Sequence, residues 1–182
     1  MLKNTDNSYG VVAKSFHWIL FFMLTFSVVA GNFLASMPKG PEKLQAAAMH
    51  KSFGVIILLL ILARFAWKLS NPTPKASNDA TPVEERLAHG MHWLLYALMF
   101  AQPLSGILMT QSAGYPVSVF GLFELPALVD KSPSSAEFFR DAHGVIWIVL
   151  ALSVFGHVGA AMFHHFVRKD DVLRSMTAGS KA

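Results

Sequence analysis

The feature that most constrains this chain is an uninterrupted apolar stretch near its C-terminus. No Lys, Arg, Asp or Glu occurs between Ala142 and Val167, although four residues in this range are histidines. A helix needs about 20 mostly apolar residues to cross the hydrocarbon core of a membrane. The stretch therefore predicts a transmembrane helix over about 142–167, and ionisable groups inside such a helix generally mark function.

Two of these histidines share one face of the predicted helix. His143 and His157 are 14 residues apart. At about 100° and 1.5 Å per residue, the helix returns to within roughly 40° of its starting direction after a rise of about 21 Å. One helix face therefore presents two imidazoles, one near each side of the membrane. This pattern is typical of a helix that serves two stacked cofactors.

The composition favours a small integral membrane protein. The 182 residues suit one domain; 53% are hydrophobic and only 14% are charged, about half the usual charged share. The net charge of +4 does not indicate nucleic-acid binding, because excess Lys and Arg in a membrane protein mostly follow the positive-inside rule. There is no cysteine, which excludes disulfides, thiolate iron–sulfur clusters and covalent haem attachment. Any cofactor must therefore be held by histidine.

Three further apolar runs predict the other helices of a four-helix bundle. We expect a Pro-rich polar linker at 70–86 and an apolar loop, interrupted by Pro and Gly and lying at the membrane interface, at 112–140. Pro103 predicts a kink in the third helix. The first run is too long for the core of a signal peptide and is read as a retained span. The single domain covers residues 1–182, with spans at about 15–37, 44–69, 87–111 and 142–167.

The distribution of basic residues predicts the orientation of the bundle. Four spans place both termini on one side, and ten Lys and Arg lie on that side against five on the other. The positive-inside rule then puts both termini in the cytoplasm. The ten are Lys3, Lys14, Arg64, Lys68, Lys75, Arg86, Arg168, Lys169, Arg174 and Lys181; the five are Lys39, Lys43, Lys51, Lys131 and Arg140. Arg64 and Lys68 are expected to snorkel at the inner end of the second span.

This topology sorts the histidines by depth. His17 begins a span that starts from the cytoplasm, and His50 begins one that starts from the periplasm. His143 and His157 occupy the matching depths of the fourth span. Two pairs follow, His50 with His143 and His17 with His157, and each could supply two axial nitrogens to a haem iron between facing helices. Small residues beside them would let a porphyrin approach the backbone. These are Gly54, Gly144 and Gly156.

The remaining histidines have competing interpretations. A lone histidine in a span often hydrogen bonds to another helix, but four at paired depths, with no intramembrane carboxylate, favour ligation. His164 faces nearly the same way as His157, but a pair through it would lift the separation to about 31 Å, so His157 is preferred. His165 is expected at the interface. His89 and His92 could support a haem ligand or a quinone site, or could lie at the membrane surface.

At these residues the chain resembles the bacterial cytochrome b561 family of four-helix, di-haem membrane cytochromes, over nearly its whole length. The resemblance implies an all-α bundle enclosing two haems b, with His17 and His157 for the cytoplasmic haem and His50 and His143 for the periplasmic one. The family is also similar to the cytochrome b subunits of membrane-bound hydrogenases and formate dehydrogenases. The matching stretches are FHWIL (16–20), MHKSFG (49–54), LAHGMHWLLY (87–96), VFGLFELPAL (119–128), DAHGV (141–145) and GHVGAAMFHHF (156–166).

One branch of this family, the superoxide oxidases, oxidises periplasmic superoxide to oxygen and reduces ubiquinone. The resemblance implies that activity in the bacterial inner membrane, with the quinone near the cytoplasmic haem and His164 at the quinone site. Lys51 adjoins His50, and Arg140 precedes His143 by three residues. These two cations could guide superoxide or pair with haem propionates.

Two other functions compete with the superoxide:ubiquinone oxidoreductase. The chain could be a cytochrome b electron-transfer subunit of a membrane-bound dehydrogenase or hydrogenase-like complex, with a redox partner protein and no substrate of its own. It could also be a histidine-lined transporter for a metal ion. Haem absorbance in the purified protein excludes the transporter, and activity with superoxide alone separates the first two functions.

Overall fold

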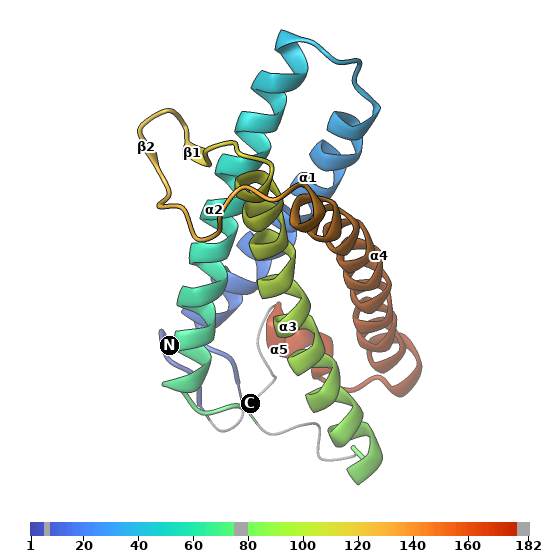
Figure 1. The fold of residues 1–182 in the computed structure, drawn as a ribbon. Helices are drawn as coiled ribbons and strands as arrows, with labels where there is room; N and C mark the ends of the chain where they lie inside the picture. Colours follow the sequence, from blue (N-terminus) through green and yellow to red (C-terminus); the bar gives the residue numbers. More distant parts are fainter. Residues whose placement is uncertain (6–7, 75–79, 178–182) are drawn as a thin grey trace.

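Four long helices make up the computed structural model (Figure 1), which describes residues 1–5, 8–74 and 80–177. Each is long and apolar enough to cross a membrane, so the predicted four-span α-helical bundle is confirmed. Lys75 and Lys181, counted above in predicting the orientation, lie outside the described residues. The helices are α1 (Val11–Ser36), α2 (Pro41–Leu69), α3 (Pro82–Ser112) and α4 (Pro133–Phe163), and α4 continues as a π-helical turn η1 (His164–Arg168) before the short helix α5 (Val172–Met176).

The third helix begins earlier than the apolar pattern predicts. It starts at Pro82 and not near 87, so the linker expected at 70–86 is shorter than predicted. Thr81 and Glu84 form a capping box, in which each side chain bonds the other residue's backbone N–H. Such a box fixes a helix start even where the first turn is polar. The helix continues through Pro103 to its end.

The fourth helix also begins earlier, at Pro133 and not near 142. Its N-cap is Ser132, whose hydroxyl accepts from the backbone N–H of Ser135. Proline in the first turn lacks only an N–H that would be unpaired there in any case. The loop expected at 112–140 therefore ends at this cap, and the first turns of α4 are polar turns that stand outside the apolar stretch.

The helices pack in sequence order, α1 against α2, α2 against α3 and α3 along α4. One buried cluster joins all four helices. Only between 6% and 33% of the most apolar window of each helix is buried inside the protein, so large apolar side chains cover the outside. A bundle surrounded by lipid has this distribution, because lipid tails are as apolar as the core. The joining cluster comprises Leu20, Ile57, Ile61, Leu95, Tyr96, Met99 and Leu150.

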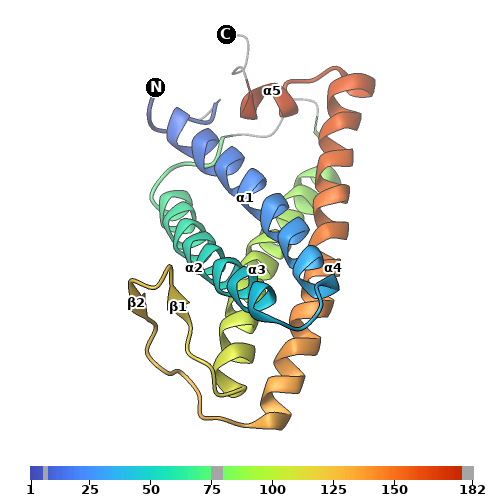
Figure 2. The ribbon, with the colours of Figure 1, turned by 90° about the horizontal axis from the view of Figure 1, so that it is seen from above.

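The two ends of the bundle differ. At one end the start of α1 meets α5, where the Trp18 indole Nε1 donates to the Met176 carbonyl at 2.9 Å. Toward the other end β1 (Ser118–Val119) pairs antiparallel with β2 (Phe123–Glu124). Figure 2 shows these two features at opposite ends, here named the α5 end and the hairpin end. The hairpin lies within the loop expected at the membrane interface, and it packs on α2.

The hairpin is anchored through one buried serine. Ser52 of α2 is 1% exposed; its hydroxyl lies 3.2 Å from the Ser118 carbonyl and accepts from the Phe120 backbone N–H at 2.9 Å. Phe120 has a positive φ of 51°, a strained conformation for a bulky residue that needs support from its surroundings. Nearby, Val117 and Val119 are buried against the bundle.

We expect Ser52→Ala to loosen the hairpin without unfolding the bundle. The substitution removes the acceptor of a buried backbone N–H, which costs about 1–3 kcal/mol. Amide hydrogen exchange over residues 117–124 should accelerate by about tenfold or more. Ser36→Ala is the matched control, because the exposed Ser36 hydroxyl donates only to the Phe33 carbonyl of its own helix. Equal exchange in the two variants would contradict the anchoring role.

Candidate functional site

The structure brings the four paired histidines together as two facing pairs. The ring centroids of His17 (α1) and His157 (α4) lie 6.2 Å apart at the α5 end. Those of His50 (α2) and His143 (α4) lie 6.5 Å apart at the hairpin end. Each pair joins two helices that are not neighbours in the chain. The helix period and the alternating direction of the spans predict these two juxtapositions.

Both separations suit two imidazoles on opposite sides of one metal ion. An imidazole nitrogen binds a metal at about 2.0–2.1 Å and lies about 1 Å from its own ring centroid, so trans ligands have centroids about 6 Å apart. No group of three or more His, Cys, Asp or Glu suited to a metal ion occurs in the described part of the chain. Two trans imidazoles are the ligand set of a planar macrocycle such as haem, which already supplies the other four nitrogens.

At the hairpin end, His143 is oriented by hydrogen bonds from α3. Its Nδ1 donates to the Gln102 backbone carbonyl at 2.9 Å, and the Ser105 hydroxyl lies 3.0 Å from the same nitrogen. A backbone carbonyl can only accept, so Nδ1 carries the proton and Nε2 keeps its lone pair. The Gln102 side-chain amide donates to that Nε2 at 3.0 Å. This tautomer is the one a metal-ligating imidazole needs.

The partner His50 is held closely, but its ring has no hydrogen bond to any residue that the structure describes. Its Nδ1 is buried and has no partner among the described residues. A Cβ added at Gly31 of α1 would lie 3.1 Å from the His50 ring, and one added at Gly106 of α3 would lie 3.2 Å from the His143 ring. Each imidazole therefore packs against a glycine at a position where a larger residue would displace the ring. An unbonded imidazole in apolar surroundings fits a group that supplies the missing partner.

The space beside the histidines is open at two of the glycines chosen from the sequence. A Cβ added at Gly54 or Gly144 would meet nothing within 4 Å, whereas one at Gly156 would meet Met91 at 3.6 Å. A flat macrocycle can approach the backbone at the first two positions. The glycines that touch the imidazoles, Gly31 and Gly106, were not among those that the sequence singled out.

At the α5 end, His17 contacts a cation. An Arg64 guanidinium nitrogen lies 3.2 Å from His17 Nδ1. A guanidinium can only donate, so here Nδ1 accepts and the proton sits on Nε2. This tautomer is opposite to that of His143. The other member of the pair, His157, has no hydrogen bond to its ring within the described residues and also contacts the His92 ring, with centroids 5.4 Å apart.

The remaining histidines differ in their exposure and in the residues that they contact. His92 is half-buried beside His157, which places it next to a paired histidine. His89 is exposed and accepts from the Trp93 indole one turn later, at 3.0 Å, as expected for a residue at the membrane surface. His165 stacks edge-on against its neighbour Phe166. Of the two uncertain histidines of α3, only His92 contacts a paired histidine in the described part of the chain.

His164 lies in the π-helical turn and is engaged by a carboxylate. Its Nδ1 is 2.6 Å from Asp170 Oδ2, and both side chains are largely buried. Lys169 adopts a left-handed conformation with φ of 58°, which turns the chain back so that Asp170 reaches the ring. Nearby, Arg168 contacts Glu84 of α3. π-Helical turns are rare and occur frequently at functional sites.

The two cations expected to guide an anionic substrate differ in exposure. Lys51 is half-buried at the hairpin end, and its Nζ donates to the Pro116 carbonyl at 3.4 Å. Arg140 is exposed in the early turns of α4, about one turn before His143. Both cations therefore lie near the hairpin-end pair in sequence and in fold.

Besides the two glycines that pack against the imidazoles, sequence reasoning missed three residues whose side chains lie within hydrogen-bond distance of the paired histidines. Arg64 was expected to snorkel outward, yet it contacts His17. Gln102 and Ser105 stand within an apolar span and both contact His143. Polar residues inside a span are expensive and commonly functional, so Gln102 and Ser105 carried a usable signal in the sequence.

The chain is similar to known membrane cytochromes over almost its whole length. The family described as prokaryotic cytochrome b561 matches residues 8–179. Cytochrome b561 homolog 2 of Escherichia coli (strain K12) is 32% identical over 187 residues, covering 98% of this chain and 96% of the relative. Probable superoxide oxidase CybB of Yersinia pestis is 27% identical, covering 92% and 94%. Cytochrome b561 homolog 1 of Escherichia coli (strain K12) is 26% identical, covering 93% and 97%.

We expect Asp170→Ala to loosen the turn that holds His164. The change removes the His164 partner and the acceptor of the Val172 backbone N–H, so hydrogen exchange over residues 164–172 should accelerate by about tenfold. Asp171→Ala is the control, because the Asp171 contact with Arg174 is half exposed. The same acceleration in both variants would show that Asp170 has no special role in the turn.

Proposed function

Because the chain belongs to the prokaryotic cytochrome b561 family, we propose that it holds two b-type haems and carries electrons from one membrane face to the other. Membership of the family implies b-type haem. In this proposal His17 and His157 ligate one haem at the α5 end, and His50 and His143 ligate the other at the hairpin end. The single observation that carries it is the occurrence of two facing imidazole pairs, each about 6 Å apart, at opposite ends of one bundle.

The side chains around the pairs suit electron transfer. A b-type haem held by a histidine pair would supply one-electron transfer at its iron, and the two imidazoles of the pair would occupy the positions at which a substrate could otherwise bind. The chain contributes orientation: the Gln102 carbonyl fixes the His143 ring and its tautomer. The apolar cluster between the pairs, which includes Leu20, Ile61 and Leu150, excludes water from the centre of the bundle.

For the two substrates we propose superoxide as donor and ubiquinone as acceptor. Two superoxide anions give two electrons and two molecules of oxygen, and ubiquinone takes two electrons and two protons to form ubiquinol. The relative named probable superoxide oxidase supports this assignment. Superoxide hardly crosses a hydrocarbon core, since burying an unpaired charge is costly. Its electron would therefore enter at the histidine pair on the side of the membrane from which it comes.

The proposed orientation of the protein in the membrane follows from the distribution of its basic residues. The α5 end, with the richer share of Lys and Arg, faces the cytoplasm, and the hairpin end faces the periplasm of a bacterial inner membrane. Superoxide then reacts near His50 and His143, guided by Lys51 and Arg140. Ubiquinone is reduced near His17 and His157. For the quinone site we propose His164 and His92, with His89 at its surface edge; His92 lies beside His157, and His164 has a carboxylate partner in Asp170.

We expect two haems per chain, and we expect each haem to be removed by replacing either of its two histidine ligands. His50→Ala and His143→Ala should each remove the hairpin-end haem, and His17→Ala and His157→Ala the α5-end haem, because each haem loses one of its two axial ligands. Pyridine haemochrome analysis against protein mass should fall from about two haems to about one in each variant. His164→Ala is the control and should retain both haems. A ratio near one in the wild type, or loss of a haem only with His164→Ala, would refute the pairing.

We expect Lys51→Gln with Arg140→Gln to slow haem reduction by superoxide. Removing two cations near an anion's target lowers the encounter rate by about threefold to tenfold at low salt, and weakens its salt dependence. Stopped-flow mixing measures this, with reduced quinone as a second donor whose rate should stay the same. Lys39→Gln, at a loop position between α1 and α2, is the matched control. Equal rates for wild type and double variant would remove the steering role, and no reduction of wild type by superoxide would leave a partner protein as the donor.

A further inference from the structure

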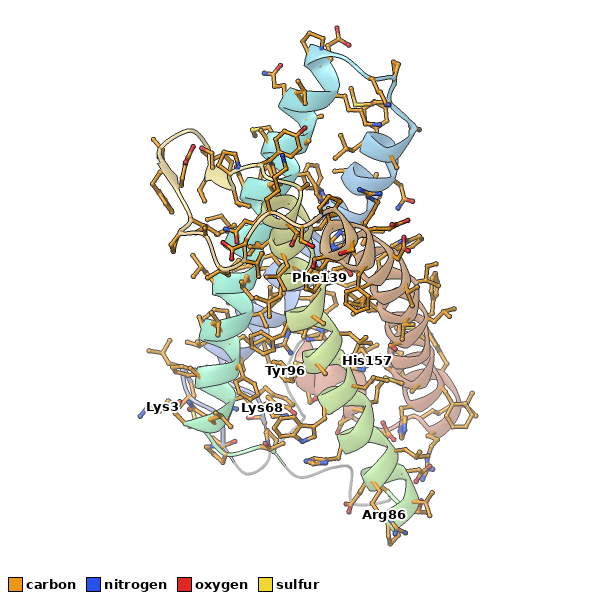
Figure 3. The ribbon with its side chains drawn as sticks, in the orientation of Figure 1. Lys3, Lys68, Arg86, Tyr96, Phe139 and His157 are labelled. Carbon is orange, nitrogen blue, oxygen red and sulfur yellow. The ribbon has the colours of Figure 1, made fainter. Side chains whose placement is uncertain are left out.

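Two cations of α2 turn into the bundle at the α5 end. Arg64 and Lys68 are half-buried and stand one helical turn apart. The Arg64 guanidinium carbon lies 5.7 Å, and the Lys68 Nζ 5.2 Å, from the centroid of the Tyr96 ring. Lys68 Nζ also lies 5.2 Å from the Trp93 ring. Figure 3 shows Lys68 and Tyr96 in the same half of the bundle as His157. Aromatic faces attract cations but cannot neutralise their charge.

Neither cation has a carboxylate partner among the residues that the structure describes. A charge in a water-poor bundle is expensive unless an anion balances it. The carboxylates paired at this end are already engaged by other groups. Glu84 contacts Arg168, Asp170 contacts His164, and Asp171 contacts Arg174.

A tyrosinate does not supply the missing charge either. Tyr9, just before α1, is half-buried and close enough to Arg64 and Tyr96 to feel their charges. Burial raises the pKa of its phenol above the usual value, although Arg64 opposes that change. The phenol therefore stays neutral at physiological pH. It therefore balances neither cation.

The present contact of Arg64 cannot persist when His17 binds iron. If the iron takes Nδ1, it occupies the atom to which Arg64 now donates. If it takes Nε2, the proton moves to Nδ1, because a metal-ligating imidazole donates through its other nitrogen. A protonated Nδ1 no longer accepts from a guanidinium. In either case Arg64 must find a new acceptor near His17.

We propose that Arg64 and Lys68 bind the two propionate carboxylates of the haem at the α5 end. The inference rests on the proposed ligation of that haem by His17 and His157. A b-type haem carries two propionates, and the chain offers two unbalanced cations one turn apart beside one of its ligands. Charge-assisted bonds to a carboxylate are among the strongest in proteins, and arginine can make two to one group. Tyr96 holds both cations in place while leaving their charges unpaired.

The proposal predicts how the two cations affect the redox potential of this haem. Cations at the propionates disfavour the ferric state, which carries one more positive charge than the ferrous state. Replacing them should therefore lower the midpoint potential of the α5-end haem. Loss of two charge-assisted bonds should also speed the transfer of this haem to a haem-free acceptor protein by about tenfold or more.

The experiment uses the His50→Ala protein, which by the pairing above holds only the α5-end haem. Its midpoint potential is measured by spectroelectrochemical titration, alone and combined with Arg64→Gln, Lys68→Gln and both. Each single variant should lower the potential, and the double variant should lower it further. Arg64→Lys, which keeps the charge, should restore most of the loss. Arg86→Gln is the matched control, because Arg86 is exposed at the same end and its Nε donates to the Pro82 carbonyl of its own helix.

The Lys68→Gln variant distinguishes propionate binding from an effect that Arg64 exerts through the His17 ring. Arg64 contacts His17 and could change the potential through that ring alone, whereas Lys68 contacts the Trp93 and Tyr96 rings and, among the described residues, neither ligand, so that it acts only through the propionates. A shift with Arg64→Gln but none with Lys68→Gln would overturn the proposal. Because the single variants each retain one cation, they give this answer even if the double variant does not fold.

An anionic lipid headgroup is the other anion that could meet these cations. The titrations are therefore repeated in nanodiscs of phosphatidylcholine and of phosphatidylglycerol. Propionate binding predicts the same shifts in both, and shifts confined to phosphatidylglycerol would assign the cations to lipid and overturn the proposal. Unchanged potential and haem transfer in the double variant, with the haem present, would overturn the inference alone. Absence of any haem from the His50→Ala protein would instead refute the proposed function.

Discussion

The arrangement of this protein depends on placing imidazoles in pairs within an apolar bundle. A polar ring in lipid-like surroundings is costly unless something satisfies it, and the described chain offers His50 and His157 no hydrogen bond. The pairs lie at opposite ends, about 6 Å from ring to ring in each. Side chains of α4 therefore have to reach a ring of α1 at one end and a ring of α2 at the other. Gly31 of α1 leaves room for the His50 ring, and Gly106 of α3 leaves room for the His143 ring.

The parts of the fold that follow from helix geometry could be predicted from the sequence. A rigid 3.6-residue period places His143 and His157 on one face, and alternating spans bring each to its partner. The helix starts could not be found from apolar patterns, because the first turns of α3 and α4 are polar and held by local caps at Thr81 and Ser132. Those caps are readable signals, but each competes with a Pro-rich composition that is also typical of a linker.

Contacts between helices were the least predictable part of the site. Arg64 and Lys68 look from the sequence like residues that extend toward the headgroups. They turn inward because Tyr96 and Trp93 of α3 present aromatic faces at the same height, which depends on the register between α2 and α3. The contact of His92 with His157 likewise depends on the register between two helices, α3 and α4, and could not be predicted from the sequence. A single sequence gives the direction of a residue on its own helix, whereas its partner is set by packing.

The two ends of the bundle also differ in a way that bears on the direction of electron flow. Under the proposed ligation, His143 donates through Nδ1 to the Gln102 carbonyl, which makes the imidazole a stronger ligand and favours the ferric state at the hairpin end. At the α5 end, two cations without described carboxylate partners favour the ferrous state. Both effects raise the potential of the α5-end haem relative to the other; Lys51 and Arg140 at the hairpin end oppose them, but Arg140 is exposed, so solvent screens its charge. Under the proposed ligation and orientation, an electron that enters at the hairpin end would be driven toward the α5 end, where a quinone would meet cytoplasmic protons.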